Sequence, residues 1–345
     1  MASLKKIRVG NIFIGGGERI AVQSMLNTKT ADVKASVMQI CRLKELGCDI
    51  VRAAVPDLEA AEAIREIKRL VDVPFVADIH FDYRLALAAI EAGADKIRIN
   101  PGNMPKDKVA LIAAKCKERE IPIRVGVNGG SLSRELHKKY GGVTAEAMVE
   151  SAFENIKILN DCDFDDICIS LKASSVPINV AAYRLMAKRS PYPLHLGVTE
   201  AGTERQGIIK SAVGIGSLLL DGIGDTLRVS LTAEPEKEVP AAYGILSAAG
   251  IHKGIEIVSC PTCGRTRIDL ISIAKEVEER LTGIDKPLKV AVMGCAVNGP
   301  GEARDADIGI AGGDGDALLF KKGEIVRKVK EDEIISALLS EIEKM

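Results

Sequence analysis

The first 250 residues repeat one pattern eight times: a short run of β-branched and aliphatic residues is followed by an amphipathic helical stretch. The strand-like runs are AVQSML, DIVRAAV, PFVADIHF, KIRINPG, IRVGVNGG, ICISLKAS, LHLGVTE and TLRVSLTAE. Signals that start or stop helices lie between the runs, namely Thr30, Asp57, Asp82, Thr144, Gly47 and Gly93. Eight units of about 30 residues predict an α/β fold, a TIM (β/α)8 barrel, and a doubly wound open sheet is the alternative.

The pattern changes near residue 251. A strand (IEIVS), a helix over 270–281, a second strand (LKVAVMG) and a glycine-rich loop precede a hairpin, with its turn at Lys322-Gly323, and a terminal helix. This order predicts a small α+β domain over 251–345 after a barrel over 1–250. A further hairpin is expected in IRVGNIFIGGGERI, before the first barrel strand. Because the chain has no Trp, only six Phe and five Tyr, its core must be mainly aliphatic.

Charge and hydropathy exclude several classes of partner. The net charge is −1, and residues 251–345 carry 14 Lys and Arg against 17 Asp and Glu, which disfavours nucleic acid and anionic membranes. The most apolar run, 212–220, is too short to span a bilayer. We therefore expect a cytoplasmic protein. In that compartment its eight cysteines would be thiols or metal ligands rather than disulfides.

Polar side chains gather toward the carboxyl ends of the predicted barrel strands, where TIM-barrel active sites form. Since residues two apart in a strand face the same side, the alternation predicts an inward-facing set. This set is Arg52, Asp78, His80, Arg98, Asn100, Arg124, Asn128, Ser170, Lys172, Arg228 and Ser230. Five cations from five strands are thus expected at one end of the barrel.

Cations held in a barrel mouth require counter-charge, because burying an unpaired ion is strongly unfavourable. Asp78, Glu200 and Glu234 would supply part of it, so internal ion pairs that merely close the barrel are one interpretation. The arginines outnumber these carboxylates, and guanidinium groups suit phosphate oxygens. The sequence therefore favours a substrate with two phosphates.

Two weaker signals lie beside this cluster. The NGGS stretch at 128–131 either adds backbone N–H donors to the anion site or is an ordinary turn. Asp78 and His80 are candidates for acid–base chemistry, although His80 can equally be a hydrogen-bonding residue without a catalytic part.

The C-terminal domain carries two cysteine motifs, CPTCGR (260–265) and GCAVNGPGE (294–302). A structural zinc ribbon needs a second close pair of ligands, whereas Cys295 stands alone with His252 as the only other soft ligand. Cys260, Cys263 and Cys295 instead suit a cubane iron-sulfur cluster with one iron that lacks a thiolate. Glu302 is the candidate oxygen ligand of that iron, and zinc is the alternative. The remaining thiols are interpreted as structural, namely Cys41, Cys48, Cys116, Cys162 and Cys168.

These motifs closely resemble a known family, the 4-hydroxy-3-methylbut-2-enyl diphosphate synthases, iron-sulfur enzymes of the non-mevalonate isoprenoid pathway. The resemblance covers nearly the whole chain and lies in VQSM, VRAAVP, DIHF, KIRINPGN, RVGVNGGSL, SLKAS, GVTEAG, RVSLT, SCPTCGRT and MGCAVNGPGEA. It implies the bacterial two-domain form, a TIM barrel with a 4Fe-4S cluster domain. The implied reaction is reductive ring opening of 2-C-methyl-D-erythritol 2,4-cyclodiphosphate to 4-hydroxy-3-methylbut-2-enyl diphosphate, with two electrons from ferredoxin or flavodoxin and loss of water.

The resemblance also implies roles for single residues. It places the cluster on Cys260, Cys263, Cys295 and Glu302, and the diphosphate on Arg52, Arg98, Arg124, Lys172, Arg228 and Ser230, with Asn128 and His80 nearby. It makes Glu200 the proton donor and Asn298 a group beside the cluster. It further implies a homodimer in which the cluster domain of one subunit covers the barrel mouth of its partner.

Two other functions are compatible with parts of the sequence. A non-redox hydro-lyase would use a three-cysteine cluster only as a Lewis acid, and it would act without an electron donor. A zinc-ribbon nucleic-acid module fused to a barrel would carry stoichiometric zinc, but its charge has the wrong sign.

Overall fold

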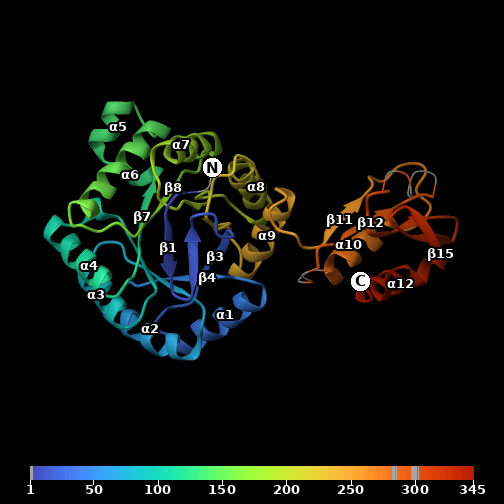
Figure 1. Cartoon of the computed structure of the whole chain (residues 1–345), viewed down its shortest axis with the longest axis horizontal. Coiled ribbons are helices and arrows are strands. Elements are labelled where there is room, and N and C mark those ends of the chain that lie inside the picture. The colour runs from blue at the N-terminus through green and yellow to red at the C-terminus, as the bar shows by residue number, and fades with distance from the viewer. Residues whose placement is uncertain (1–2, 282–283, 285, 297–300, 302) are drawn as a thin grey trace. The chain divides into compact units, whose positions relative to one another are not determined.

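In the computed structural model, which describes residues 3–281, 284, 286–296, 301 and 303–345, the chain divides into two units, Met1–Ala249 and Gly250–Met345. The first unit holds an eight-stranded parallel sheet surrounded by helices, and the second holds a five-stranded mixed sheet (Figure 1). Within the described part of the chain, no helix is long and apolar enough to cross a bilayer.

The eight runs with strand-like pattern all form strands of one barrel. They are β3 (Ala21–Met25), β4 (Ile50–Ala54), β5 (Phe75–Asp78), β6 (Lys96–Ile99), β7 (Ile123–Asn128), β8 (Ile167–Lys172), β9 (His195–Leu196) and β10 (Thr226–Leu227). β10 pairs with β3, and a parallel bridge from Ile169 to Leu194 joins β8 to β9, so the sheet closes on itself. The predicted TIM barrel is confirmed, and the doubly wound open sheet is not the fold.

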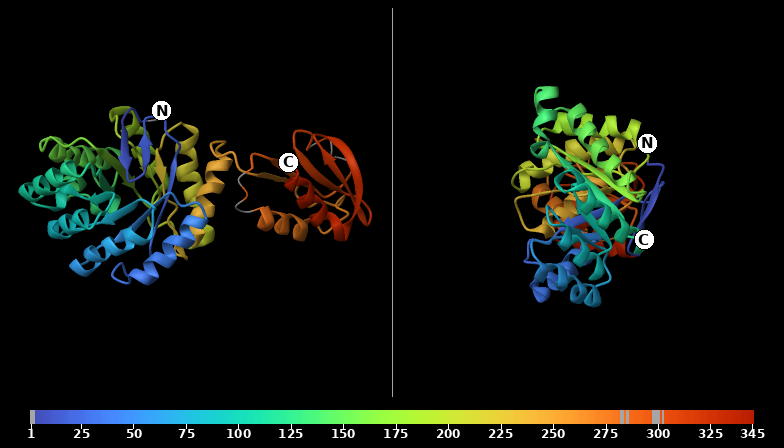
Figure 2. Two further views of the ribbon diagram at one scale, coloured as in Figure 1. Left: turned by 60° about the horizontal axis from the view of Figure 1, so that its bottom comes forward. Right: turned by 90° about the vertical axis from the view of Figure 1, so that its left-hand side faces the viewer.

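Helices ring the strands, as Figure 1 and the turned views of Figure 2 show. They are α1 (Val33–Glu45), α2 (Leu58–Leu70), α3 (Tyr83–Glu91), α4 (Lys106–Glu118), α5 (Arg134–Tyr140), α6 (Ala145–Asn160), α7 (Val176–Arg189), α8 (Glu204–Leu220) and α9 (Glu238–Ala248). Short 3-10 turns occur at Pro101–Asn103, Gly129–Ser131 and Pro235–Lys237.

The start signals predicted for α2, α3 and α6 are their N-caps, since Asp57, Asp82 and Thr144 each accept a hydrogen bond from the first turn. Thr30 was wrong as a helix start. Asp32 caps α1 instead, because the hydroxyl of Thr30 donates to the carbonyl oxygen of Ala54 at 2.6 Å.

The predicted N-terminal hairpin forms the floor of the barrel. β1 (Lys6–Val9) and β2 (Ile12–Gly15) pair antiparallel. Their apolar side chains pack on residues near the amino ends of the barrel strands, in a cluster of Ile7, Val9, Ile14, Ala21, Ile50, Val76 and Cys168. The hairpin therefore covers the amino end of the barrel with apolar side chains.

The second unit is built on the sheet order β11-β12-β13-β14-β15. Its elements are β11 (Glu256–Ser259), α10 (Leu270–Leu281), β12 (Lys289–Met293), β13 (Ile308–Gly312), β14 (Asp316–Lys321), β15 (Glu324–Lys330), the 3-10 turn Glu331–Glu333 and α12 (Ile334–Glu343). The hairpin turns at Lys322 and Gly323, both with positive φ, as a two-residue turn requires. β13 is not predicted from the sequence, because its IGIAG stretch is rich in glycine and resembles a loop. β13 pairs parallel with β12 and antiparallel with β14.

Candidate active site

Five cationic side chains from five strands meet inside the barrel. They belong to Arg52 on β4, Arg98 on β6, Arg124 on β7, Lys172 on β8 and Arg228 just after β10. Arg124 is 1% exposed and Lys172 7% exposed, and the other three side chains are 12–14% exposed. The parity of the strands predicted this set, and the structure places its members almost out of contact with water.

Asp78, at the end of β5, neutralises part of the charge. Its carboxylate lies 3.1 Å from Nη1 of Arg98 and 3.7 Å from Nε of Arg52. Burial raises the pKa of Asp78, but the guanidinium groups of Arg52, Arg98 and Arg124 outweigh burial and hold the pKa below its ordinary value. Asp78 is thus a fixed anion at neutral pH and is not poised to exchange a proton.

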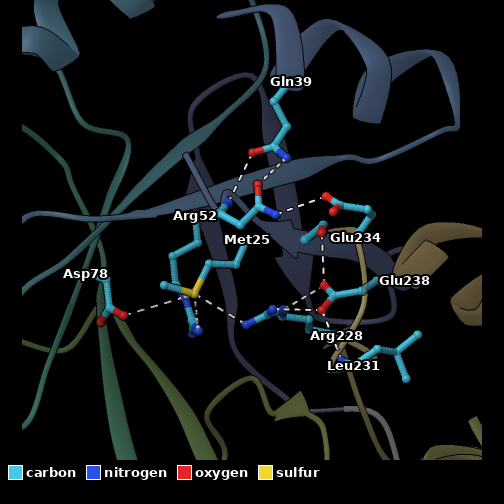
Figure 3. A network of polar contacts seen from close by, with 10 residues as sticks. Met25, Gln39, Arg52, Asp78, Arg228, Leu231, Glu234 and Glu238 are labelled. Carbon is cyan, nitrogen blue, oxygen red and sulfur yellow. Dashed lines mark hydrogen bonds and ion pairs between the residues drawn. The ribbon is translucent and has the colours of Figure 1, made fainter. Parts of the chain in front are cut away.

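A second carboxylate, Glu238 at the start of α9, was missed from the sequence. It accepts two hydrogen bonds from Arg228, through Nε at 2.9 Å and Nη2 at 2.8 Å (Figure 3). It also accepts from the Ser24 hydroxyl at 2.9 Å and the Leu231 backbone N–H at 3.2 Å. With four donors, this 2%-exposed carboxylate is fully satisfied. A search for polar residues at strand ends does not find Glu238, because this residue belongs to a helix.

Two other carboxylates expected from the sequence, Glu234 and Glu200, do not neutralise these cations. Glu234 accepts from Nδ2 of Asn27 at 3.1 Å, and Glu238 rather than Glu234 neutralises Arg228. Glu200 is exposed and has a φ of 52°, the left-handed region that non-glycine residues seldom adopt. Among the described residues, Asp78 and Glu238 are therefore the carboxylates that form ion pairs with these cations, and they pair with three of the five, Arg52, Arg98 and Arg228.

The positive charge that Asp78 and Glu238 do not pair with belongs to Arg124 and Lys172. Nε and Nη1 of Arg124 are buried without a hydrogen-bond partner among the described residues. Burial and then the charge of Arg98 lower the pKa of Arg124 to about 10. Burial and then Arg52 and Arg124 lower the pKa of Lys172 well below its ordinary value. An anion bound among these groups would supply the missing acceptors.

Further buried polar groups lie on the same inward face, closer to the amino end. Lys96 and His195 are fully buried, and Nζ of Lys96 and Nε2 of His195 have no partner among the described residues. Burial lowers the pKa of Lys96 to about 8. Burial and then Arg124 lower the pKa of His195, so its imidazole is neutral and shares a hydrogen bond with Thr226. Lys96 is not among the residues expected above, although its spacing of two from Arg98 is a signal that it faces inward.

Two glycines make room for the cations. A Cβ at Gly126 would lie 2.8 Å from Nε of Arg98, and a Cβ at Gly197 would lie 2.5 Å from Nζ of Lys172. Such distances are too short for any side chain to occupy without displacing the cation. The absence of side chains at these inward positions therefore fixes where the two charged groups sit.

The other predicted site residues lie at the edge of this cluster. The side chain of His80 is 59% exposed, with Nε2 at 3.9 Å from Asp78. Asn128 ends β7, and its backbone N–H donates to Oγ of Ser131 at 3.2 Å, so the NGGS stretch forms a tight turn. Ser230 is half-buried and follows Arg228 by two residues.

In the C-terminal unit, two of the predicted cysteine ligands follow neighbouring parallel strands. Cys260 follows β11 and Cys295 follows β12, and these strands pair through Ser259 and Val292. The backbone N–H of Gly294 donates to Sγ of Cys260 at 3.2 Å. Both thiols therefore emerge at the same edge of the sheet.

Cys263 is exposed and is the third thiol of the motif. Hydrogen bonds from the backbone and then the side chain of Arg265 hold the pKa of Cys263 below its ordinary value, which favours the thiolate that binds metals. Among the described residues, no three Cys, His, Asp or Glu side chains are close enough to hold a metal ion. Glu302 and Asn298 lie outside the described residues. The donor chemistry at this edge fits an iron-sulfur cluster, with three thiols on two adjacent loops.

The remaining five cysteines belong to the barrel unit, and all eight cysteines are free thiols. Cys48, Cys116 and Cys168 are buried, as expected for structural thiols, and Cys162 is half-buried. Cys41 differs, since it is exposed on α1 rather than packed.

Comparison with protein families gives two matches that together span both units. Residues 4–243 match the model of the GcpE TIM-barrel domain, and residues 256–344 match that of the GcpE protein C-terminal domain. The chain belongs to the GcpE family.

Curated relatives of this GcpE chain carry one enzyme name. A protein of Clostridium perfringens named 4-hydroxy-3-methylbut-2-en-1-yl diphosphate synthase (flavodoxin) is 59% identical over 341 residues, 98% of each chain. A protein of Geobacter sulfurreducens with the same name is 59% identical over 346 residues, 100% of this chain and 98% of the relative. The family expected from the sequence motifs is thereby confirmed.

Solved structures resemble the barrel of this GcpE chain at low identity. A type I 3-dehydroquinate dehydratase from Clostridium difficile has a TM-score of 0.53 and 14% identity, and covers 71% of this chain and 97% of its own. A dihydropteroate synthase from Stenotrophomonas maltophilia has a TM-score of 0.52 and 16% identity, over 67% and 92%. Likeness at this level supports the barrel fold alone.

Proposed function

We infer that the chain is an oxidoreductase that reduces 2-C-methyl-D-erythritol 2,4-cyclodiphosphate to 4-hydroxy-3-methylbut-2-enyl diphosphate, the reaction of isoprenoid biosynthesis that its GcpE relatives are named for. The observation that carries this inference is the barrel mouth, where two buried and three partly buried cations meet two carboxylates. A diphosphate would restore the balance of charge and satisfy the free nitrogens of Arg124.

The residues of the barrel would bind and orient the substrate. Arg52, Arg98, Arg124, Lys172, Arg228 and Ser230 are the proposed diphosphate ligands, with Asn128 and His80 at the edge of the site. Because Asp78 and Glu238 hold three of the arginines in place before substrate arrives, little reorganisation is needed on binding. Glu200 is proposed to protonate the oxygen that leaves as water.

A 4Fe-4S cluster is the proposed cofactor, held by Cys260, Cys263, Cys295 and Glu302, with Asn298 beside it. When bound, it would deliver two electrons singly and act as a Lewis acid on the departing oxygen. What this chain contributes is the thiolate-favouring surroundings of Cys263 and the N–H donated to Cys260.

The name of the relatives supports flavodoxin as electron donor, and ferredoxin is the other donor considered. We place the enzyme in the cytoplasm, in keeping with eight free thiols. We also propose a homodimer in which the cluster domain of one subunit meets the barrel of its partner. A monomer with full activity in sizing and assay would reject that assembly.

Anaerobic turnover of the cyclodiphosphate, with and without reduced flavodoxin, tests the function. Product is expected only when the donor is present. Consumption of the cyclodiphosphate at the same rate without a donor, with a dehydrated product at the oxidation level of the substrate, would instead support a non-redox hydro-lyase, the second candidate, because three thiols can hold a Lewis-acidic cluster.

Two variants test the assigned roles in the same assay. Glu200→Gln should bind substrate and turn over poorly, and Glu302→Ala should keep some iron but lose most turnover. Unchanged turnover in either variant would remove that residue from the mechanism.

A further inference from the structure

The sulfur of Met25, the last residue of β3, lies between two of the proposed diphosphate ligands (Figure 3). Sδ is 2.8 Å from Nη2 and 3.1 Å from Nε of Arg52 on β4. It is also 3.3 Å from Nη1 of Arg228, which follows β10. β3 pairs with both β4 and β10, so the side chain of Met25 separates two guanidinium groups that would otherwise face each other.

The sulfur contacts the parts of the guanidinium groups that the carboxylates leave open. Glu238 occupies Nε and Nη2 of Arg228, and Nη1 is left to Met25. Asp78 approaches Arg52 only at 3.7 Å, through Nε, while Nη2 of Arg52 faces the sulfur. Some of the N–H donors that Arg52 and Arg228 could offer an incoming phosphate are therefore those that Met25 contacts.

A thioether is a weak hydrogen-bond acceptor. It can hold a guanidinium in position without the strength of an amide or carboxylate oxygen, so a phosphate oxygen displaces it readily. An amide oxygen at the same place would compete with phosphate, because hydrogen bonds to charged donors are among the stronger ones.

We propose that Met25 is a positioning residue of the anion site, whose sulfur spaces Arg52 and Arg228 and releases their N–H donors to the diphosphate. The inference rests on the proposed diphosphate site and goes beyond it by giving a role to an uncharged residue that need not touch the reacting atoms.

The test compares the parent chain with Met25→Gln, which has a strong acceptor, and Met25→Leu, which has none but keeps a similar volume. Inorganic pyrophosphate is titrated into each full-length protein by calorimetry, and thermal unfolding is followed in parallel. Met25→Gln should bind about tenfold more weakly, which is the worth of one charge-assisted hydrogen bond. Met25→Leu should stay within about threefold of the parent. Met38→Gln, on the exposed face of α1, is the matched control and should change nothing.

A second measurement does not depend on how the variants fold. In parent protein labelled with 13C at the methionine methyl groups, the Met25 signal should shift on addition of pyrophosphate while the Met38 signal stays in place. An unmoved Met25 signal at saturation would overturn the proposal.

The remaining outcomes distinguish failure of the proposed diphosphate site from failure of the proposed role of Met25. If the parent chain binds no pyrophosphate, the proposed diphosphate site fails and the inference with it. If the parent binds but Met25→Gln binds equally well, or both Met25 variants lose affinity equally, only the inference fails, because acceptor strength would then be irrelevant.

Discussion

The buried Lys96 destabilises the folded chain when it is charged. Its ammonium group is fully buried without a partner among the described residues, and burial lowers its pKa from 10.5 to about 8. A lysine whose pKa is lower in the folded than in the unfolded chain destabilises the folded state when protonated. The penalty is complete below pH 8 and disappears as the pH rises from 8 to 10.5.

Lys96→Met should therefore raise the free energy of unfolding at pH 7 by about 3 kcal/mol, the equivalent of the pKa shift. The gain over the parent should shrink to nothing near pH 10.5. Denaturant titrations at pH 7, 9 and 10.5 measure this, with Lys188→Met on the exposed surface of α7 as control. A gain that did not depend on pH would show that the charge of Lys96 is not its cause.

Gly197 gives a second prediction at this scale. An alanine there would press on Nζ of Lys172 and on the backbone oxygen of Arg228, so Gly197→Ala should weaken pyrophosphate binding about tenfold, roughly the loss of one charged hydrogen bond. Gly216→Ala in α8, where the added methyl meets nothing closer than 3.9 Å, is the control and should bind as the parent does. Equal affinity in both variants would mean that Lys172 does not contact the anion.

The sequence predicted the five cations but only one of the two carboxylates that pair with them, Asp78. Strand parity finds Arg98, Arg124 and Asp78 because alternation along a strand fixes which side chains face inward. Glu238 was out of reach of that rule, since it enters the site from the first turn of a helix and its position depends on how α9 packs on β3. Parity alone cannot report contacts between elements far apart in the chain.

At the scale of elements, the hairpin of β1 and β2 closes the end of the barrel opposite the cations. Ile14 is fully buried in this floor, whereas its neighbour Phe13 is 48% exposed. Ile14→Ala should lower the free energy of unfolding by about 2–5 kcal/mol, because it leaves a cavity among well-packed groups. Phe13→Ala should cost well under half of that. Denaturant titration measures both losses of unfolding free energy. Equal losses in the two variants would contradict the proposal that Ile14 packs in the buried floor and Phe13 does not.

Periodicity predicted all eight barrel strands and the bounds of α10, yet it missed β13 and placed one helix start two residues early. Both errors have local causes. The Gly309 and Gly312 positions in β13 resemble a loop, but glycine is required at 309 because a Cβ there would lie 2.6 Å from the ring of Phe320. Thr30 resembles a cap, but its hydroxyl is taken by the carbonyl of Ala54.

The complete chain carries an anion-binding barrel and a second unit that bears three of the eight thiols. Cys295→Ala should lose most of the iron bound by the protein, because three thiols are the expected anchors of the cluster. Cys41→Ala should keep the parent's iron content, since Cys41 lies on the surface of α1 in the other unit. Iron and sulfide analysis after anaerobic purification measures both. Iron that persisted in Cys295→Ala would remove Cys295 from the ligand set.

The most direct test of the central claim is the electron paramagnetic resonance spectrum of the reduced, anaerobically purified protein, recorded before and after addition of the cyclodiphosphate. The proposed function predicts about four irons per chain, as a cubane cluster requires, and a spectrum that changes when substrate binds at the proposed cluster. Stoichiometric zinc in place of iron, or a spectrum indifferent to substrate, would contradict it.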